Sequence, residues 1–155
     1  MNLKQELKAE KVIHLDLSGY CQVESGTPIR DVLAQMRAEK HNVSLVVADG
    51  KLVGIFTDRD VLRKVAAQPE TWDLPVDEVM TRNPVTVTAD TSAAAALKLI
   101  EEKNFRNVPV VDEDGRILGD MTFRAIIKYL ADRYPIQILN RPPNPERFPR
   151  KPEGG

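Results

Sequence analysis

The sequence predicts a mixed α/β fold (α+β) of two β-α-β-β-α repeats whose sheets pack about a pseudo-twofold axis. Short β-branched runs alternate with amphipathic helical segments along most of the 155 residues. An Asp-Gly hairpin signal occurs twice, and the pattern Gly-x-x-Thr-x-Arg at residues 54–59 returns at 119–124. A chain of this length suffices for one compact domain or for two small lobes that share a core.

The first half of the chain contains two helix-start signals around a hairpin. Thr27-Pro28 predicts a helix with Thr27 as its cap, running to about residue 40. Residues 43–47 are nearly all β-branched and apolar, Asp49-Gly50 is typical of a two-residue hairpin turn, and residues 51–56 return as the partner strand. Thr57 then caps a second helix, which ends near residue 68.

The second half repeats this order. Residues 85–88 resemble a strand, and Thr91 is expected to cap a helix over 92–103. Strands at 108–111 and 116–121 flank Asp114-Gly115, and Thr122 begins another helix. The expected division of the chain is an N-terminal helical arm (1–11) that frays or packs on a partner, repeat 1 (12–69), a connector (70–84), repeat 2 (85–134) and a Pro-rich tail (135–155), expected to be disordered.

The two copies indicate a tandem duplication. Residues 41–65 align with residues 106–130 without a gap, and eight of the 25 positions are identical. Average residue usage would give roughly one or two. The upstream helices match with a shift of one residue.

This ordered combination resembles a tandem pair of CBS domains, the Bateman module. The likeness lies in the helix starting at Thr27 or Thr91, the apolar strand after it, the Asp-Gly hairpin, and the Gly-φ-φ-Thr-x-Arg-Asp ending at residues 54–60. It covers roughly residues 10–134. The resemblance implies a stand-alone regulatory module that binds adenosine nucleotides in the cleft between its repeats and pairs into homodimers through its helices.

Thr57, Arg59 and Asp60 are the central candidates for binding. A helix start with a hydroxyl and a guanidinium suits a phosphate, and a carboxylate can accept both hydroxyls of a ribose. A capping box is the alternative, with Asp60 accepting the Thr57 N–H. The resemblance favours the nucleotide. Carried over by position, it implies a site formed by Ile55, Thr57, Arg59, Asp60, Val85, Thr86, Arg106, Asn107 and Pro109.

The second site departs from the family pattern. Ala125 replaces Asp60, and Asp120 replaces Ile55, which places a carboxylate near the base and the phosphates. We therefore expect one competent and one degenerate site. The residues of the degenerate site are Gln22, Asn42, Thr122 and Arg124, with Cys21 and Ser44 beside them.

The ligand is expected to be an adenosine nucleotide. With Arg59 and Arg106 as its cations, the site favours AMP or ADP over ATP, while NAD and S-adenosylmethionine stay possible. The alternative function is a structural dimerisation or adaptor module with no physiological ligand. Either way the protein target is not identified by the sequence.

Composition excludes several other classes. The net charge of −1 gives no support for a nucleic acid or an anionic membrane as partner. Residues 1–11 lack the apolar core of a secretory signal, and the single cysteine, Cys21, cannot form an internal disulfide, so a reducing cytoplasmic location is expected. No Walker loop or Cys/His cluster points to catalysis or to a metal, and no enzyme activity is expected.

Overall fold

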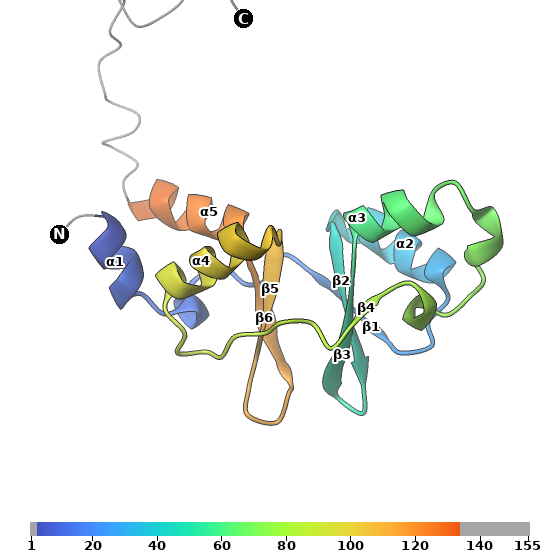
Figure 1. Ribbon diagram of the computed structural model, residues 1–155, viewed down its shortest axis with the longest axis horizontal. Coiled ribbons are helices and arrows are strands. Elements are labelled where there is room, and N and C mark those ends of the chain that lie inside the picture. Colours follow the sequence, from blue (N-terminus) through green and yellow to red (C-terminus); the bar gives the residue numbers. More distant parts are fainter. Residues whose placement is uncertain (1–2, 134–155) are drawn as a thin grey trace, which may run out of the picture.

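The computed structural model describes residues 3–133, and the predicted tail from residue 135 lies outside them. The chain forms two lobes that lie side by side, each with its sheet toward the centre and its helices outside (Figure 1). The first lobe contains β1 (Cys21–Glu24), α2 (Ile29–Glu39), β2 (Val43–Ala48), β3 (Lys51–Thr57), α3 (Asp58–Asp60), the π-helical turn η2 (Val61–Val65) and β4 (Thr81–Arg82). The second lobe contains α4 (Ala93–Lys103), β5 (Asn107–Val111), β6 (Ile117–Thr122) and α5 (Phe123–Arg133).

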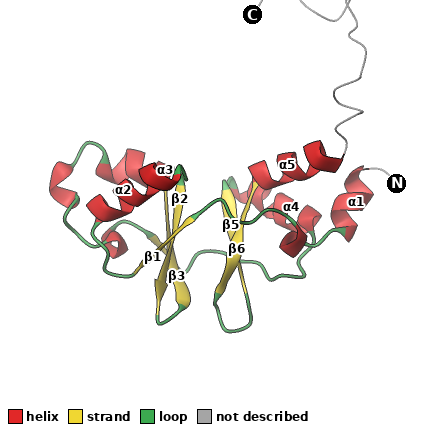
Figure 2. Cartoon of the chain, turned by 180° about the vertical axis from the view of Figure 1, so that it is seen from behind, coloured by secondary structure: helices red, strands yellow, loops and turns green. Residues whose placement is uncertain are grey.

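The sheets follow the predicted topology. Strand β1 runs parallel to β2, and β3 runs antiparallel to both β2 and β4. In the second lobe β5 and β6 form an antiparallel hairpin, and the predicted strand at 85–88 contributes a parallel bridge from Val87 to Val110. Figure 2 shows from behind that the two hairpins face each other between the outer helices. The predicted fold class is confirmed.

Two segments cross from one lobe to the other. The N-terminal segment, residues 3–20, contains α1 (Leu3–Ala9) and the 3-10 turn η1 (Val12–His14), and it packs on the second lobe through Leu7, Val12, Leu15 and Leu17. The connector, residues 69–84, contains the 3-10 turns η3 (Pro69–Thr71) and η4 (Val76–Glu78). It packs on the first lobe through Val76, Val79 and Met80. Residues 12–17, grouped with repeat 1 in the sequence, thus complete the core of the second lobe.

The prediction that the copies align without a gap is wrong. Val46 pairs with Gly54 and Val110 pairs with Gly119, so the copies are offset by 64 residues before the hairpin and by 65 after it. The additional residue lies in the second turn. The first turn consists of two residues with positive φ, Asp49 and Gly50. The second turn lies between the paired residues Asp112 and Arg116, and its last residue, Gly115, has φ +84°.

Two predicted helix caps are also wrong. The Thr27 hydroxyl donates to the carbonyl of Glu24, and the Thr91 hydroxyl accepts from the N–H of Thr88, so both side chains close the turn before their helix. Helix α4 is capped instead by Ser92, whose oxygen accepts from the N–H of Ala95 at 3.1 Å. Helix α5 begins directly after Thr122, which the sequence predicted as its start, and Thr122 Oγ1 caps it by accepting from the N–H of Ala125.

Candidate functional site

A cavity of about 430 Å³ lies between the lobes where α3 begins. Strand β3 contributes Ile55 and its last residue, Thr57, and the following turn brings Arg59 and Asp60 to the cavity. The second lobe contributes Phe105, Arg106 and Asn107 from the end of α4 and the start of β5. This arrangement follows from the chain order, because each sheet presents its cleft face to the other lobe.

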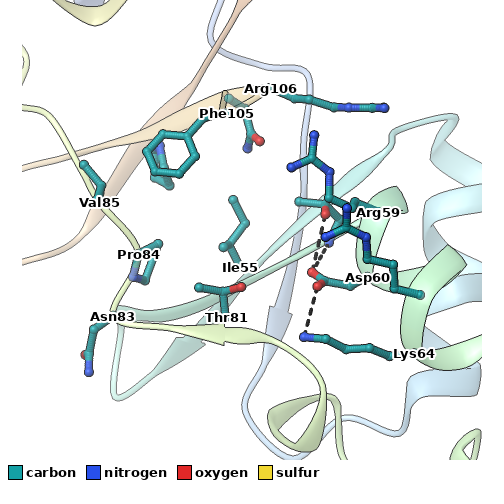
Figure 3. Close-up of a pocket in the computed structure, with 14 residues that line it drawn as sticks. Ile55, Arg59, Asp60, Lys64, Thr81, Asn83, Pro84, Val85, Phe105 and Arg106 are labelled. Carbon is teal, nitrogen blue, oxygen red and sulfur yellow. Dashed lines mark hydrogen bonds and ion pairs between the residues drawn. The ribbon is translucent and has the colours of Figure 1, made fainter. Parts of the chain in front are cut away.

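The cavity has an apolar half and a polar half. The apolar side chains are Ile55, Pro84, Val85, Phe105 and Pro109. Figure 3 shows Phe105, Pro84 and Val85 on one side and Arg59, Asp60 and Lys64 on the other. A planar apolar group and an anionic group joined by a short linker would match these two halves.

Asp60 is the carboxylate of the polar half, and the chain holds it from two sides. It is only 9% exposed. Its Oδ2 accepts the backbone N–H of Thr57 at 3.0 Å, the reciprocal contact of a capping box. Its Oδ1 lies 3.2 Å from Nζ of Lys64, which also donates to the carbonyl of Val79 at 2.9 Å. Oδ2 also accepts the Thr57 hydroxyl at 3.4 Å, so a ligand that binds both carboxylate oxygens would take the place of that hydroxyl.

Four cations line the cavity, and the sequence analysis anticipated two of them. Arg63 and Lys64 join Arg59 and Arg106. Their spacing of three or four residues from Asp60 on a helix start was the signal that could have identified them. With these additional charges, the number of cations alone does not distinguish AMP or ADP from ATP.

The structure brings together every predicted residue of the competent site except one. Ile55, Thr57, Arg59, Asp60, Val85, Arg106, Asn107 and Pro109 all line the cavity, whereas Thr86 does not. Thr81, Asn83, Pro84 and Phe105 also line it and were not predicted. Three of these four belong to the connector. The sequence did not predict that the connector would pack on the first lobe.

A second cavity of about 450 Å³ occupies the related position at the start of α5. It contains the predicted Asn42, Thr122 and Arg124, together with Ala125. Gln22, Cys21 and Ser44 do not line it. Gln22 is exposed, while Cys21 and Ser44 are paired in the β1–β2 ladder and buried, which raises the pKa of the Cys21 thiol to about 11. The ungapped alignment misplaced part of this set, because Leu45 rather than Ser44 is the counterpart of Pro109.

Asp120 corrects a further expectation for the second cavity. The carboxylate was expected to face the base and the phosphates, but it is fully buried and does not line that cavity. Both of its oxygens accept from Nδ2 of Asn107 at 2.9 Å. Burial raises the pKa of Asp120 to about 7, against the lowering effect of the Asn107 hydrogen bonds.

Within residues 3–133 no three His, Cys, Asp or Glu side chains gather closely enough to hold a metal ion. The same part of the chain has no helix that is long and apolar enough to cross a bilayer.

Comparison with known sequences identifies the family. The CBS domain model matches residues 21–67 and 76–132. An uncharacterised 17.7 kDa protein of Acidianus ambivalens is 31% identical over 133 residues, which are 84% of this chain and 79% of that protein. The arabinose 5-phosphate isomerase KdsD of Pseudomonas aeruginosa is 34% identical over 123 residues, 79% of this chain but only 37% of the isomerase.

Solved structures give the same result. CBSX2 of Arabidopsis thaliana, in a structure with AMP, superposes with a TM-score of 0.70 at 26% identity, over 80% of this chain and 98% of that one. The CBS domain pair of MJ0100, in complex with 5′-methylthioadenosine and S-adenosyl-L-methionine, gives a TM-score of 0.68 at 25% identity, over 79% and 97%. The chain therefore belongs to the CBS domain family and consists of two CBS domains in tandem.

Proposed function

We propose that this CBS pair is a regulatory module that binds one adenosine nucleotide per chain in the first cavity. The observation that carries the proposal is the division of that cavity into an apolar half and a cationic half around the Asp60 carboxylate. The related structure of CBSX2 holds AMP, and that of MJ0100 holds 5′-methylthioadenosine and S-adenosyl-L-methionine; all three share an adenine and a ribose. Binding would act on a partner protein through the relative position of the lobes.

The proposed contacts follow the two halves. The adenine lies among the apolar side chains, the ribose hydroxyls donate to Asp60, and Thr57 and Arg59 bind the phosphate. Arg106 and Asn107 close the cavity from the second lobe.

The second cavity lacks the central requirement for the same ligand. Ala125 offers no acceptor for a ribose, and the side chains opposite it differ from those of the first cavity. His41 and Leu45 are the counterparts of Phe105 and Pro109, and of these two only His41 lines the second cavity. We therefore expect isothermal titration calorimetry to give one site per chain, and two equivalent sites would contradict the proposal.

Asp60→Asn is the variant that tests the ribose contact. Asparagine keeps an oxygen that can accept the Thr57 N–H, but it cannot accept from both ribose hydroxyls. We expect AMP affinity to fall about 10- to 100-fold, the usual effect of losing a charged hydrogen-bond partner. Asp73→Asn makes the same charge change at a carboxylate that is 83% exposed and outside the cavity, so its affinity should match the unmodified protein. Equal affinity of Asp60→Asn and Asp73→Asn would exclude Asp60 as the ribose partner.

A dimerisation or adaptor module is the second candidate. Leu62 and Ile127 occupy corresponding positions in the two repeats and are 77% and 54% exposed. Phe123 at the start of α5 is also exposed. A homodimer would cover these side chains, and Leu62→Arg with Ile127→Arg should then give a monomer in analytical ultracentrifugation.

A thermal-shift screen with AMP, ADP, ATP, NAD and S-adenosylmethionine separates the candidates, because a ligand at 100 times its dissociation constant stabilises the folded protein by about 2.7 kcal/mol. A flat screen would favour the adaptor.

A further inference from the structure

An ion pair joins the two lobes at the edge of the first cavity. Nη1 of Arg106, which precedes β5, lies 2.8 Å from Oδ2 of Asp58, the first residue of α3. Both side chains are partly exposed, the guanidinium at 63% and the carboxylate at 37%, so a ligand can reach them. A contact of this kind in water contributes little to stability, and a competing anion can replace it.

The two partners differ in what they line. Arg106 lines both cavities, whereas Asp58 lines only the second. The guanidinium therefore stands where the two cavities meet, and its partner carboxylate lies on the far side from the apolar half. Asp58 neutralises one of the four cations of the first cavity without itself belonging to that cavity.

The remaining cations are not equally available. Lys64 is paired with Asp60. Arg59 and Arg63 have no ion pair or hydrogen bond from their guanidinium groups to any residue in the described part of the chain. These two groups are enough to neutralise one phosphate. Each further phosphate in a nucleotide adds about one negative charge, and the next cation is Arg106, which Asp58 already occupies.

We propose that Asp58 determines how many phosphates the bound nucleotide carries, by holding Arg106 away from the ligand. A nucleoside diphosphate or triphosphate must displace Asp58 from Arg106 before that guanidinium can bind the additional phosphate. A monophosphate needs neither step. The pair thus selects against longer phosphate chains, although the cavity as a whole is rich in cations. This inference rests on the proposed nucleotide site and assigns the residue that sets its specificity.

The test compares dissociation constants for ADP and AMP by calorimetry, in EDTA at fixed ionic strength. In Asp58→Asn the guanidinium of Arg106 is released and one negative charge is lost. We expect the ratio of the ADP to the AMP dissociation constant to fall about 3- to 5-fold, the upper part of the range for one partly exposed ion pair.

Asp16→Asn is the matched control. Asp16 lines the second cavity, is 37% exposed like Asp58, and is paired with Lys128 at 2.7 Å, so the variant makes the same change in charge. Its ratio should stay within about twofold of the unmodified protein, because a lost negative charge outside the Arg106 pair acts weakly through water. Equal shifts in Asp58→Asn and Asp16→Asn would overturn the proposal, since the effect would then be one of net charge.

The double variant Asp58→Asn/Arg106→Gln separates release of Arg106 from direct repulsion by Asp58. If Asp58 acts through Arg106, the ratio in the double variant equals that of Arg106→Gln alone. A further fall on adding Asp58→Asn to Arg106→Gln would overturn the proposed route. AMP binding with an unchanged ratio in Asp58→Asn would overturn this inference and leave the nucleotide site intact, whereas no binding of any adenosine nucleotide to the unmodified protein would overturn both.

Discussion

At the scale of single residues, Asp120 shows how one substitution changes a site. It occupies the position that Ile55 has in the first lobe, on the cleft face of the sheet. Burying a carboxylate there is unfavourable. The Asn107 amide stabilises the Asp120 carboxylate by hydrogen bonding, and burial raises the pKa of Asp120. Asn107 thereby serves two functions, because it also lines the first cavity.

The raised pKa of Asp120 predicts a dependence of stability on pH. The folded protein binds this proton more tightly than the unfolded chain does, so the contribution is fully present below about pH 4 and is lost as the pH rises through about 7. Between pH 5 and pH 8 the free energy of unfolding should fall by about 2 kcal/mol more in the unmodified protein than in Asp120→Asn. Urea unfolding at four pH values measures this difference. His14 and His41 are the same in both proteins, so parallel pH profiles would show that Asp120 is ionised throughout.

Residue patterns alone predicted the polar half of the first cavity well. Thr57, Arg59 and Asp60 are close in sequence, and one turn of helix fixes where they lie. The two interpretations of Asp60 are compatible, because the carboxylate can keep the Thr57 N–H while its other acceptor positions serve a ligand. Phe105 and Pro84 could not be predicted in the same way, since apolar residues next to a strand usually enter a core and only the tertiary fold shows which ones border a cavity.

At the scale of elements, the hairpins show where the repeat was misread. Both hairpins contain Asp-Gly, and an alignment that matches the two dipeptides conceals that the second turn is one residue longer. The error propagated to every residue before the turn, so that Asn42 was matched to Asn107 although its counterpart is Arg106. Turn length depends on backbone angles, such as the positive φ of both Asp49 and Gly50 in the first turn, and these do not follow from the dipeptide alone.

The crossing segments pack closely on a glycine in each sheet, and the two sites predict different tolerances. A Cβ atom at Gly119 would stand 2.3 Å from Cβ and 3.0 Å from the backbone oxygen of Leu17. That oxygen accepts the N–H of Asp120, so the segment cannot withdraw without losing a hydrogen bond. At Gly54 the nearest atoms all belong to the flexible end of Met80.

Gly119→Ala should therefore lower the free energy of unfolding by about 2 to 3 kcal/mol, and Gly54→Ala by about 1 kcal/mol. Neither glycine has a positive φ, so backbone strain does not enter the comparison. Chemical denaturation of the two variants under one set of conditions measures both values. A larger loss in Gly54→Ala would mean that Met80 is held more firmly than Leu17.

At the scale of the whole molecule, the crossing segments make the two lobes interdependent. Val12 reaches the core of the second lobe and Val76 the core of the first, and both are fully buried. The backbone secures the N-terminal crossing as well, since the N–H of Ala93 donates to the carbonyl of Glu10 at 2.7 Å. A sequence repeat predicts two similar units, but it does not show that the segment before the first unit packs on the second, or that the connector packs on the first. That depends on pairings between residues far apart in the chain.

This packing of the N-terminal segment on the second lobe predicts that the lobes unfold together. Trp72, the single tryptophan, packs beside the core of the first lobe and donates its Nε1–H to the carbonyl of Val65, so its fluorescence reports on that lobe. Val12→Ala removes two methyl groups from the core of the second lobe and should cost about 1 to 2 kcal/mol. Because the core of the second lobe is built from residues on both sides of the first lobe in the chain, the urea midpoint seen by Trp72 fluorescence should fall by as much as the midpoint seen by circular dichroism. Ile13→Ala, at an exposed neighbour in η1, should leave both midpoints nearly unchanged. A Trp72 midpoint that stays fixed while the circular dichroism midpoint falls would show that the lobes unfold separately, and a ligand in the cleft would then have to create the coupling that the fold alone does not provide.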